Sequence, residues 1–428
     1  MKTTKNPASL FLLVALCVFL SINALAIEKN STATKLEPIT RQLVTMVEHN
    51  AEIKRMLVES IEQAKAINPD RATNPANTLE EYYSFIDWAA KAMPWSIVPN
   101  LPYSSLYDQI DQSLDYFYFV NDRPLPELKN KGYYNNSLQY HEPYRTWLIN
   151  FVKEWGVYLS KEGSWKDEYY QKALADKRFG LQKDWYEDPS KWKSFNDFFA
   201  RHLKSPDKRP IAFPHDSSII SSPADSKPQG VWNIDTYSNI APQKGIAIKS
   251  TVFQSVAELI GKESAYRNAF ANGTLTHTFL DVDDYHRYHV PFDGTIKEVR
   301  IIPGDDAVGG MITWDAKTRK YVLDTNTPGW QNIETRGCVI IENKTYGLVA
   351  LLPIGMSQVS SVNFEDTIKA GKTVKKGDML GYFLFGGSDI VMLFQSKVDF
   401  TLTVPQESNS AYRHVLMGEA YGKLAIKK

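Results

Sequence analysis

Cysteine is almost absent from this chain of 428 residues, which contains two, Cys17 and Cys338. Cys17 lies in an apolar N-terminal stretch of the kind that exported proteins lose, and that loss would leave Cys338 without a partner for an internal disulfide. The few histidines and cysteines are not clustered at the spacings of a zinc site. We therefore expect neither an internal disulfide nor a bound metal.

The chain also has no excess of charge of either sign, because 49 lysines and arginines balance 49 aspartates and glutamates. A near-neutral protein has no long-range attraction for the phosphates of nucleic acids, so we expect no nucleic-acid partner. No clear basic amphipathic helix of the membrane-surface kind is present, and no repeats or long low-complexity segments interrupt the chain. Peripheral membrane contact and an oligomeric state both stay open.

One apolar run stands apart at the N-terminus. Lys2 and Lys5 precede the apolar residues 8–22, and the small residues of Ala24-Leu25-Ala26 follow. This order is typical of a secretory signal peptide, which we expect to cover residues 1–26. The run is short for a membrane-spanning helix, and an uncleaved anchor is the alternative. We expect an exported protein that is periplasmic, secreted or membrane-associated.

Residues 27–190 are predicted to form a helical N-terminal domain, because apolar side chains recur there at helical spacing. This part is also rich in tryptophan, which we expect to pack it onto the rest of the protein. A platform for a membrane surface or for an aromatic substrate is the alternative use of these rings. The predicted helices are one with apolar positions from Leu43 to Ile61 that ends at Asn68-Pro69, one that begins at the capping-box pair Thr78 and Glu81, one over residues 106–117 and one over residues 144–158.

From residue 217 onward the pattern changes to short β-rich segments separated by glycine and proline. Strands are predicted over residues 339–341, 347–352 and 389–394. The fold class that follows is α+β, in which the helical domain precedes a β-rich, sandwich-like catalytic domain over residues 191–428.

Three short segments contain the residue types that catalysis uses. Gly386-Gly387-Ser388 ends an apolar run, and glycine permits a twisted backbone before the serine. Asp225 follows a proline, while His286 and His289 are three residues apart and would converge on one pocket only in a tight turn. Taken singly, each segment has an ordinary structural interpretation: a hairpin turn for the glycines, an Asx turn for Asp225, and a packing role for either histidine.

Together, and in this order, the segments resemble the phosphatidylserine decarboxylases, and the resemblance covers about residues 194–400. A weaker match lies between Lys249-Ser250 and Leu259-Ile260-Gly261, and an N-terminal extension of this size resembles the arrangement in the related fungal tryptophan decarboxylases. The matching blocks are residues 195–204 with Arg209-Pro210-Ile211, Ser222-Pro223-Ala224-Asp225, residues 284–289, Lys376-Gly377-Asp378 and Gly386-Gly387-Ser388.

The resemblance implies self-cleavage between Gly387 and Ser388. The Ser388 hydroxyl would attack the Gly387 carbonyl, and the resulting ester would give a pyruvoyl group at the start of the fragment 388–428. This covalent cofactor, derived from Ser388, would act as the electron sink for loss of CO₂. By the same resemblance His289 is the base, Asp225 orients it, and His286 assists decarboxylation.

The chain departs from the family pattern at two positions. Ser226 stands where the family usually has glycine, which would change the turn that directs Asp225. Asp389 stands where threonine or serine is commoner, and its charge would lie near the forming oxyanion unless the side chain points away. Neither change removes a group that the chemistry requires.

The leading functional hypothesis is a pyruvoyl-dependent decarboxylase that converts phosphatidylserine to phosphatidylethanolamine and CO₂. A second hypothesis keeps the chemistry and replaces the phospholipid by a free amino acid, for example an aromatic one. A third, supported by Ser226 and Asp389 alone, is a degenerate protein that binds a lipid or an amino acid without cleaving itself.

Overall fold

The computed structural model describes residues 36–96, 105–131, 136–240, 255–305, 311–324, 330–356, 361–385, 387–407 and 411–428. The predicted signal peptide and Gly386 lie outside these ranges. Within them, no helix combines the length and the apolar character needed to cross a membrane.

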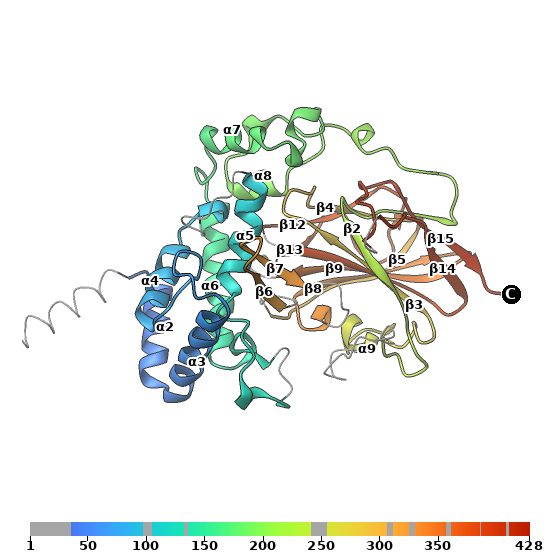
Figure 1. Ribbon diagram of the computed structural model, residues 1–428. Helices are drawn as coiled ribbons and strands as arrows, with labels where there is room; N and C mark the ends of the chain where they lie inside the picture. Colours follow the sequence, from blue (N-terminus) through green and yellow to red (C-terminus); the bar gives the residue numbers. More distant parts are fainter. Residues whose placement is uncertain are drawn as a thin grey trace, which may run out of the picture.

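The first half of the chain is helical and gathers on one side of the molecule, as Figure 1 shows. Short 3₁₀ turns join many of the helices. The α-helices are α2 (Pro38–His49), α3 (Ala51–Ile67), α4 (Leu79–Ala89), α5 (Leu106–Tyr118), α6 (Tyr144–Ser160), α7 (Asp167–Ala175) and α8 (Phe195–Phe199), with α9 (Val256–Ile260) among the strands.

The predicted first helix is two helices, which corrects the sequence interpretation. Asn50 has an extended backbone between α2 and α3, and its side-chain oxygen accepts hydrogen bonds from the backbone N–H groups of Glu52 and Ile53. An asparagine that satisfies two free donors starts a new helix at a point where the apolar spacing continues. Half of the predicted capping box is present, because the Thr78 side chain accepts from the backbone N–H of Glu81, whereas the Glu81 carboxylate accepts from the N–H of Asn77 and not of Thr78. The helices predicted over residues 106–117 and 144–158 are α5 and α6.

The second half forms antiparallel sheets. In the described residues one sheet has seven strands, in the order β11-β5-β8-β9-β13-β3-β2. Two three-stranded sheets have the orders β1-β15-β14 and β10-β12-β4, and β6 pairs with β7. The strands are β1 (Ile219–Ser221), β2 (Lys227–Asn233), β3 (Thr274–Leu280), β4 (Arg287–His289), β5 (Gly294–Ile302), β6 (Met311–Asp315), β7 (Lys320–Asp324), β8 (Arg336–Asn343), β9 (Gly347–Met356), β10 (Val362–Phe364), β11 (Thr373–Val374), β12 (Met379–Phe383), β13 (Gly387–Phe394), β14 (Val398–Leu402) and β15 (Ala420–Ile426).

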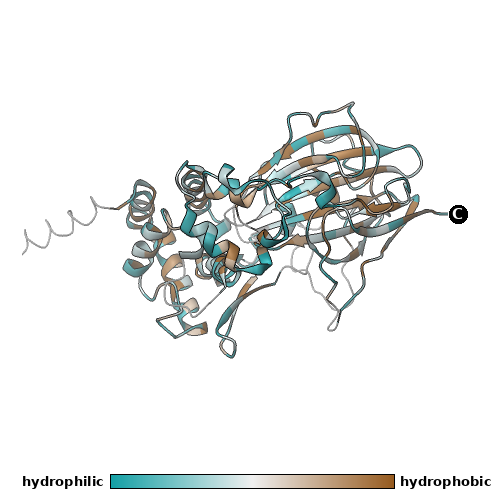
Figure 2. Cartoon of the chain, turned by 90° about the horizontal axis from the view of Figure 1, so that it is seen from above, coloured by the Kyte–Doolittle hydropathy of each residue, from teal (hydrophilic) through white to brown (hydrophobic). Residues whose placement is uncertain are grey.

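The seven-stranded sheet has a hydrophobic core on each face. One core lies between this sheet and the two three-stranded sheets, and it includes Leu280, Ile390 and Tyr421. The other core lies under α9 and includes Trp232, Val391 and Leu393. Brown, apolar stretches lie along the strands in Figure 2, and β9 and β13 are apolar over most of their length, as expected when both faces of a sheet are covered. The predicted α+β class is confirmed, and the three predicted strands are parts of β8, β9 and β13.

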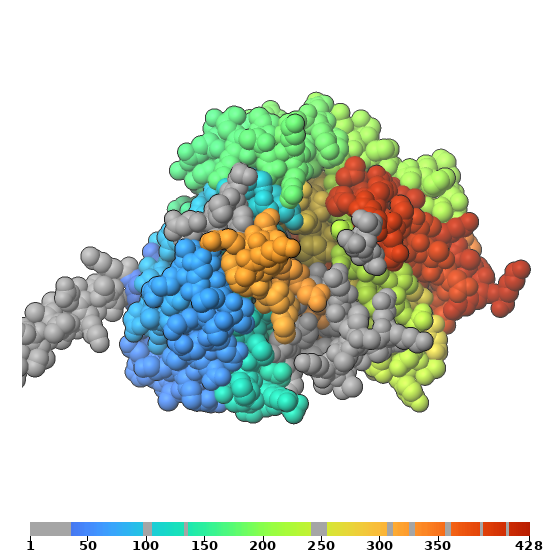
Figure 3. Space-filling model, viewed as in Figure 1, coloured from blue at the N-terminus to red at the C-terminus, as the bar shows by residue number. Residues whose placement is uncertain are grey.

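The helices pack directly onto the β-rich part. Their core continues through Val282, Tyr285, Phe385 and Met417, all of which belong to the second half of the chain. The β6–β7 hairpin lies against the helices, where Tyr321 contacts rings of α5 (Figure 3). The domain boundary predicted between residues 190 and 191 stays a prediction. Helix α8, which follows it, shares the hydrophobic core of the N-terminal helices.

Candidate active site

Ser388 is the second residue of β13, in the middle of the seven-stranded sheet. It pairs with Gly355 of β9 on one side and with Leu280 of β3 on the other. Its side chain is fully buried, and its Oγ has no hydrogen-bond partner among the described residues. Buried hydroxyls are normally paired, so an unpaired Oγ at a strand start makes Ser388 a candidate for a chemical role.

The segment before Ser388 connects two different sheets. β12 belongs to the three-stranded sheet with β4, and β13 belongs to the seven-stranded sheet. Phe385, between these strands, donates its backbone N–H to the Asn196 side-chain oxygen of α8 at 3.0 Å. Asn196 in turn donates to the Ser160 hydroxyl at the end of α6 at 2.7 Å. The helices therefore fix the chain three residues before the serine.

Phe385 also lies in an aromatic cage. Its ring contacts Trp155, Phe195 and Phe199 in edge-to-face geometry, with centroids 5.4, 5.1 and 5.2 Å away. Such pairs add packing energy in one preferred arrangement. Phe199 also stacks on the His286 ring at 3.8 Å, so the cage joins the cleavage segment to one candidate histidine.

His286 is completely buried in the loop that follows β3. Its Nδ1 lies 2.9 Å from the Asp284 carbonyl oxygen, which can only accept, so Nδ1 carries the proton in the neutral ring. Within the part of the chain that the structure describes, its Nε2 has no hydrogen-bond partner. Burial, reinforced by the nearby Arg201 guanidinium, lowers the pKa of His286 well below 6.5. The neutral ring therefore offers a free lone pair at Nε2.

His289 is buried at the end of β4. Its Nδ1 lies 2.8 Å from the Gly377 carbonyl oxygen, and its Nε2 lies 3.2 Å from the Tyr285 hydroxyl. The carbonyl again assigns the proton to Nδ1, so Nε2 is the basic atom and the tyrosine hydroxyl can donate to it. Burial lowers the pKa of His289 to about 4, although Gly377 and Asp225 act in the opposite direction. The ring is therefore neutral at physiological pH, as a base must be.

Asp225 is buried but is not hydrogen-bonded to His289. Its two oxygens accept from Arg209, with Nε–Oδ1 at 3.1 Å and Nη2–Oδ2 at 2.7 Å, and the backbone N–H of Met417 also donates to Oδ1 at 2.7 Å. Arg209 is itself buried and stacks over the Trp185 ring at 4.1 Å. The direct Asp–His contact of a Ser-His-Asp arrangement is thus replaced here by a bidentate ion pair, and Asp225 acts on His289 through its field.

The backbone nevertheless brings the predicted residues to one region. The N–H of His289 donates to the Pro223 carbonyl at 2.8 Å, so the segment containing Asp225 lies along β4. β3 ends at Leu280 opposite Ser388, and the chain then enters the loop that carries His286. Ser388 Oγ has no hydrogen bond to either histidine among the described residues, so the proton transfer requires the hydroxyl and the ring to approach each other.

The two departures from the family pattern are both accommodated. Ser226 is buried, accepts from the Thr278 hydroxyl at 2.8 Å and donates to the Ala224 carbonyl at 3.3 Å. Asp389 Oδ2 accepts from Gln331 at 3.0 Å and lies 3.0 Å from His277 Nδ1. Alternation along β13 places Asp389 on the opposite face of the sheet from Ser388.

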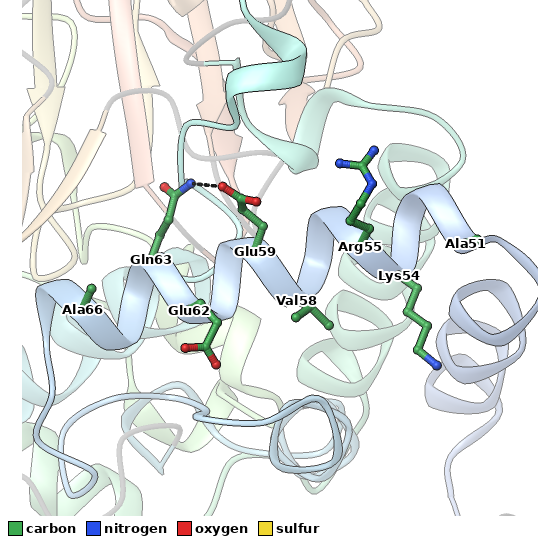
Figure 4. A pocket seen from close by; sticks show the side chains of 8 residues that line it. All are labelled: Ala51, Lys54, Arg55, Val58, Glu59, Glu62, Gln63 and Ala66. Atoms are coloured by element: carbon green, nitrogen blue, oxygen red, sulfur yellow. Dashed lines mark hydrogen bonds between the residues drawn. The ribbon is translucent and has the colours of Figure 1, made fainter.

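A cavity of about 810 Å³ borders the cleavage segment. It lies between α6 and the ends of β5 and β8, and Val157, Ile301, Phe385 and Thr335 are among its walls. The Thr335 carbonyl accepts from the N–H of Gly355, which pairs with Ser388. One wall of the cavity is thus hydrogen-bonded to the strand position beside the serine. A second hollow of about 700 Å³ follows one face of α3, remote from these residues, and is lined by the side chains shown in Figure 4.

The residues present fit a pyruvoyl precursor. A serine that becomes the start of a new fragment needs a buried, unengaged hydroxyl after a flexible residue, and Ser388 after Gly387 meets both conditions. In the part of the chain that the structure describes, no group of three or more His, Cys, Asp or Glu side chains is arranged to hold a metal.

Sequence reasoning assigned no role to three residues of the site. All three lie in blocks that carry the family resemblance: Asn196 in residues 195–204, Arg209 in Arg209-Pro210-Ile211, and Tyr285 in residues 284–289. Their positions in those blocks were a signal that they matter. Which atoms they contact could not be inferred, because the contacts depend on the tertiary fold: Tyr285 meets His289 four residues away, whereas Asn196 meets Phe385 from a distant part of the chain.

Comparison with known proteins gives a consistent result. A family model described as phosphatidylserine decarboxylase matches residues 195–423. The chain is 32% identical over 249 residues to "Phosphatidylserine decarboxylase proenzyme 2" of Oryza sativa subsp. japonica, which covers 58% of this chain and 36% of that protein. It is 31% identical over 233 residues to a phosphatidylserine decarboxylase proenzyme of Fusobacterium nucleatum subsp. nucleatum, covering 54% of this chain and 70% of that protein.

A relative with a different name also matches. The decarboxylase iboD of Amanita muscaria is 27% identical over 290 residues, which cover 62% of this chain and 80% of that protein. The chain thus spans most of the Amanita and Fusobacterium relatives but only about a third of the length of the rice protein.

Proposed function

The chain belongs to the phosphatidylserine decarboxylase family, a family of carboxy-lyases, and on that premise we propose that it cleaves itself between Gly387 and Ser388 and then decarboxylates phosphatidylserine to phosphatidylethanolamine. The observation that carries the proposal is the buried, unpaired Ser388 Oγ at the start of β13. Two neutral histidines lie in the adjoining loop and strand.

Cleavage begins when Ser388 Oγ attacks the Gly387 carbonyl carbon. His289 Nε2 takes the hydroxyl proton, the Gly387–Ser388 C–N bond breaks, and the amine leaves with a proton, so an ester replaces the amide. Loss of the Ser388 α-proton then expels the Gly387 carboxylate. Water hydrolyses the remaining unsaturated residue, ammonia departs, and a pyruvoyl group remains on fragment 388–428.

The pyruvoyl group would supply a carbonyl that binds a substrate amine and accepts electrons when CO₂ is lost. His286 is positioned to handle the proton that replaces CO₂. Its Nδ1 is tied to the Asp284 carbonyl and its Nε2 is free, so a proton placed on Nε2 is held weakly and is readily delivered.

Asp225 and Arg209 set the field around His289. The carboxylate favours the protonated ring that forms when Ser388 gives up its proton, and the bidentate arginine keeps the carboxylate oriented. Tyr285 holds His289 Nε2 from the other side at 3.2 Å and would release it to receive the serine proton.

A second candidate substrate is a free amino acid. The Amanita relative, which the chain matches over 80% of that protein's length, is named a decarboxylase with no lipid in its name. The cavity beside Phe385 has apolar walls and would admit either an aromatic side chain or part of an acyl chain.

A product assay separates these functions. The purified protein is incubated with phosphatidylserine in detergent micelles and, separately, with a panel of free amino acids that includes tryptophan, and the amine products are quantified. We expect phosphatidylethanolamine from the wild-type protein and no product from Ser388→Ala. An amine from a free amino acid with none from the lipid would favour the second candidate. No product from either substrate would support the non-cleaving binding protein.

We also propose that residues 1–26 direct the protein out of the cytoplasm, which would place the enzyme in the periplasm, outside the cell or at a membrane. The proposal rests on the lysines, the apolar run and the small residues of that segment. N-terminal sequencing of protein recovered from an exporting host tests it: a mature chain that begins after Ala26 is expected, and a retained Met1 would contradict it.

A further inference from the structure

We propose that His277 is a positioning residue for self-cleavage, because it holds the Asp389 carboxylate on the far face of the sheet. The inference rests on the self-cleavage proposed above and concerns a residue pair that this mechanism does not use. It would explain how a chain with an acid directly after its nucleophilic serine can still cleave itself.

The two side chains form a buried pair. His277 of β3 and Asp389 of β13 are both completely buried, and His277 Nδ1 lies 3.0 Å from Asp389 Oδ2. The N–H direction departs from that of a good hydrogen bond, so the contact is one of close approach. Gln331, in the 3₁₀ turn Trp330–Asn332, donates to the same oxygen at 3.0 Å. One donor and one ring nitrogen thus lie against Oδ2.

His277 is itself fixed in place. Trp232 of β2 stacks on the imidazole with centroids 4.7 Å apart and an interplanar angle of 18°. β2 and β13 flank β3 on its two sides, so the ring lies between a tryptophan and an aspartate from its neighbouring strands. Stacking on Trp232 restricts rotation of the His277 ring, so the position of its Nδ1 is fixed.

The pair lies on the opposite side of the sheet from the chemistry. Ile390, two residues after Ser388, belongs to the core between the sheets, whereas Val391, two residues after Asp389, belongs to the core under α9. Alternation along β13 thus directs Ser388 toward the first core and Asp389 toward the second. The backbone peptide that joins them is shared by both faces.

Self-cleavage builds negative charge on the Gly387 carbonyl oxygen, one residue before the serine. An unbalanced carboxylate buried nearby would raise the barrier, since charges interact strongly where water is excluded. Among the described residues Asp389 Oδ1 has no partner, so the contacts to Oδ2 are the ones that hold this group. Loss of His277 would leave Gln331 as the donor to the carboxylate among the described contacts.

The test is a double-mutant experiment on cleavage rate. The full chain is made by cell-free translation with a pulse label, and the conversion of the uncut chain is followed on denaturing gels for wild type, His277→Ala, Asp389→Asn and the double variant. Loss of a buried bond to a charged group corresponds to about a tenfold change in rate, so His277→Ala should cleave about tenfold more slowly than wild type. Asp389→Asn should cleave at about the wild-type rate, and the double variant should regain that rate.

The rescue distinguishes this role from a purely structural one. A cavity left by His277→Ala would slow cleavage whatever stands at position 389, so failure of Asp389→Asn to restore the rate would overturn the inference. His277→Gln, which keeps a donor, guards against misfolding of the alanine variant and should cleave faster than it. Cys338→Ala, which removes buried volume from the same core, is the matched control and should cleave like wild type.

The outcomes also separate this inference from the proposed function. A wild-type chain that stays uncut would refute self-cleavage itself. A wild-type chain that cuts, together with His277→Ala at an equal rate, would refute only the role of His277.

Discussion

Burial decides the protonation state of both histidines beside Ser388. In each ring Nδ1–H donates a hydrogen bond to a backbone carbonyl, so Nε2 is the basic atom. They differ at that second nitrogen, which is unpaired in His286 and lies against the Tyr285 hydroxyl in His289. The same residue type, three positions apart, is therefore prepared for two different proton transfers.

Replacement of each histidine should separate the two reactions. His289→Ala should remain uncut, because in serine proteases misplacing the catalytic imidazole already lowers the rate by about 10⁴-fold. His286→Ala should mature, at least slowly, and then lose turnover for want of its proton donor. Cleavage is read on denaturing gels and turnover from amine product. An uncut His286→Ala together with a maturing His289→Ala would reverse the assignment.

The pH dependence of cleavage should reflect the depressed pKa of His289. Because burial lowers that pKa to about 4, the base stays neutral down to mildly acidic pH. The cleavage rate of the folded precursor should be nearly constant from about pH 8 to pH 5.5 and fall with a midpoint near about pH 4, well below the ordinary value of about 6.5. A midpoint between about pH 6 and pH 7 would show that a solvent-exposed base does the work.

Stability should change in the same pH window. Between about pH 6.5 and pH 4, His289 is protonated in the unfolded chain but neutral in the folded chain. The free energy of unfolding therefore decreases as the pH falls through this range. Urea titrations of Ser388→Ala, which cannot cleave, at several pH values would measure this slope, and they provide the correction that the cleavage profile needs.

The ion pair of Asp225 with Arg209 makes a prediction of its own. Asp225→Asn should block cleavage, because His289 would lose the field that favours its protonated form. Arg209→Ala should be worse for folding, since breaking a buried ion pair leaves an uncompensated charge and costs about 3–5 kcal/mol. Arg209→Lys is the matched control that keeps the charge but loses the bidentate geometry. Thermal unfolding and cleavage are measured together; an Asp225→Asn variant that cleaves normally would contradict this role.

Ser388, His286, His289 and Asp225 were predictable because each lies in a short segment whose residue order resembles the family. The partner of Asp225 was not, since Arg209 reaches it only through the tertiary fold. Nor could the sequence decide the direction of the Asp389 side chain, which depends on the register of β13 between its neighbours. Contacts between distant segments are the part of the site that needs a structure.

Two helices hold the segment that precedes the serine. α8 supplies Asn196, whose oxygen accepts from the N–H of Phe385, and α6 supplies Ser160, which orients the Asn196 amide. The cleavage site thus depends on helices from much earlier in the chain: Asn196 precedes Phe385 by 189 residues.

Removal of this clamp should slow cleavage without affecting turnover. Asn196→Ala loses one hydrogen bond to the backbone before the scissile peptide, so cleavage should be several-fold slower, on the order of 1 kcal/mol. Turnover per pyruvoyl group, counted by hydrazine labelling, should stay near wild type. Asn196→Asp keeps the acceptor for Phe385 and should cleave faster than the alanine variant. Equal cleavage rates for wild type and Asn196→Ala would show that the aromatic cage alone fixes the segment.

Helix and strand assignments were predictable where periodicity was sustained, as in α5, α6, β9 and β13. The boundary at Asn50 was missed because the apolar spacing runs on through it, and the side-chain cap that starts α3 is a local event. Sheet order was beyond the sequence, because β13 lies between β9 and β3, which precede it by many residues.

The whole molecule is built so that cleavage does not take it apart. β13, which begins at Gly387, is flanked by β9 and β3 along its length, and β15 of the same fragment pairs with both β14 and β1. The fragment 388–428 therefore stays in the centre of the fold after its N-terminal bond is broken. Both fragments should elute together from a sizing column in native buffer and separate only after denaturation.

Intact mass spectrometry of the denatured, purified protein tests self-cleavage most directly. We predict two species, one that ends at Gly387 and one that spans residues 388–428. The smaller should be blocked to Edman degradation and lighter than a fragment with a free N-terminal serine by the mass of one ammonia molecule. Ser388→Ala should give one uncut species. A single uncut chain from folded wild-type protein, or a small fragment with a free serine amine, would contradict the proposed self-processing.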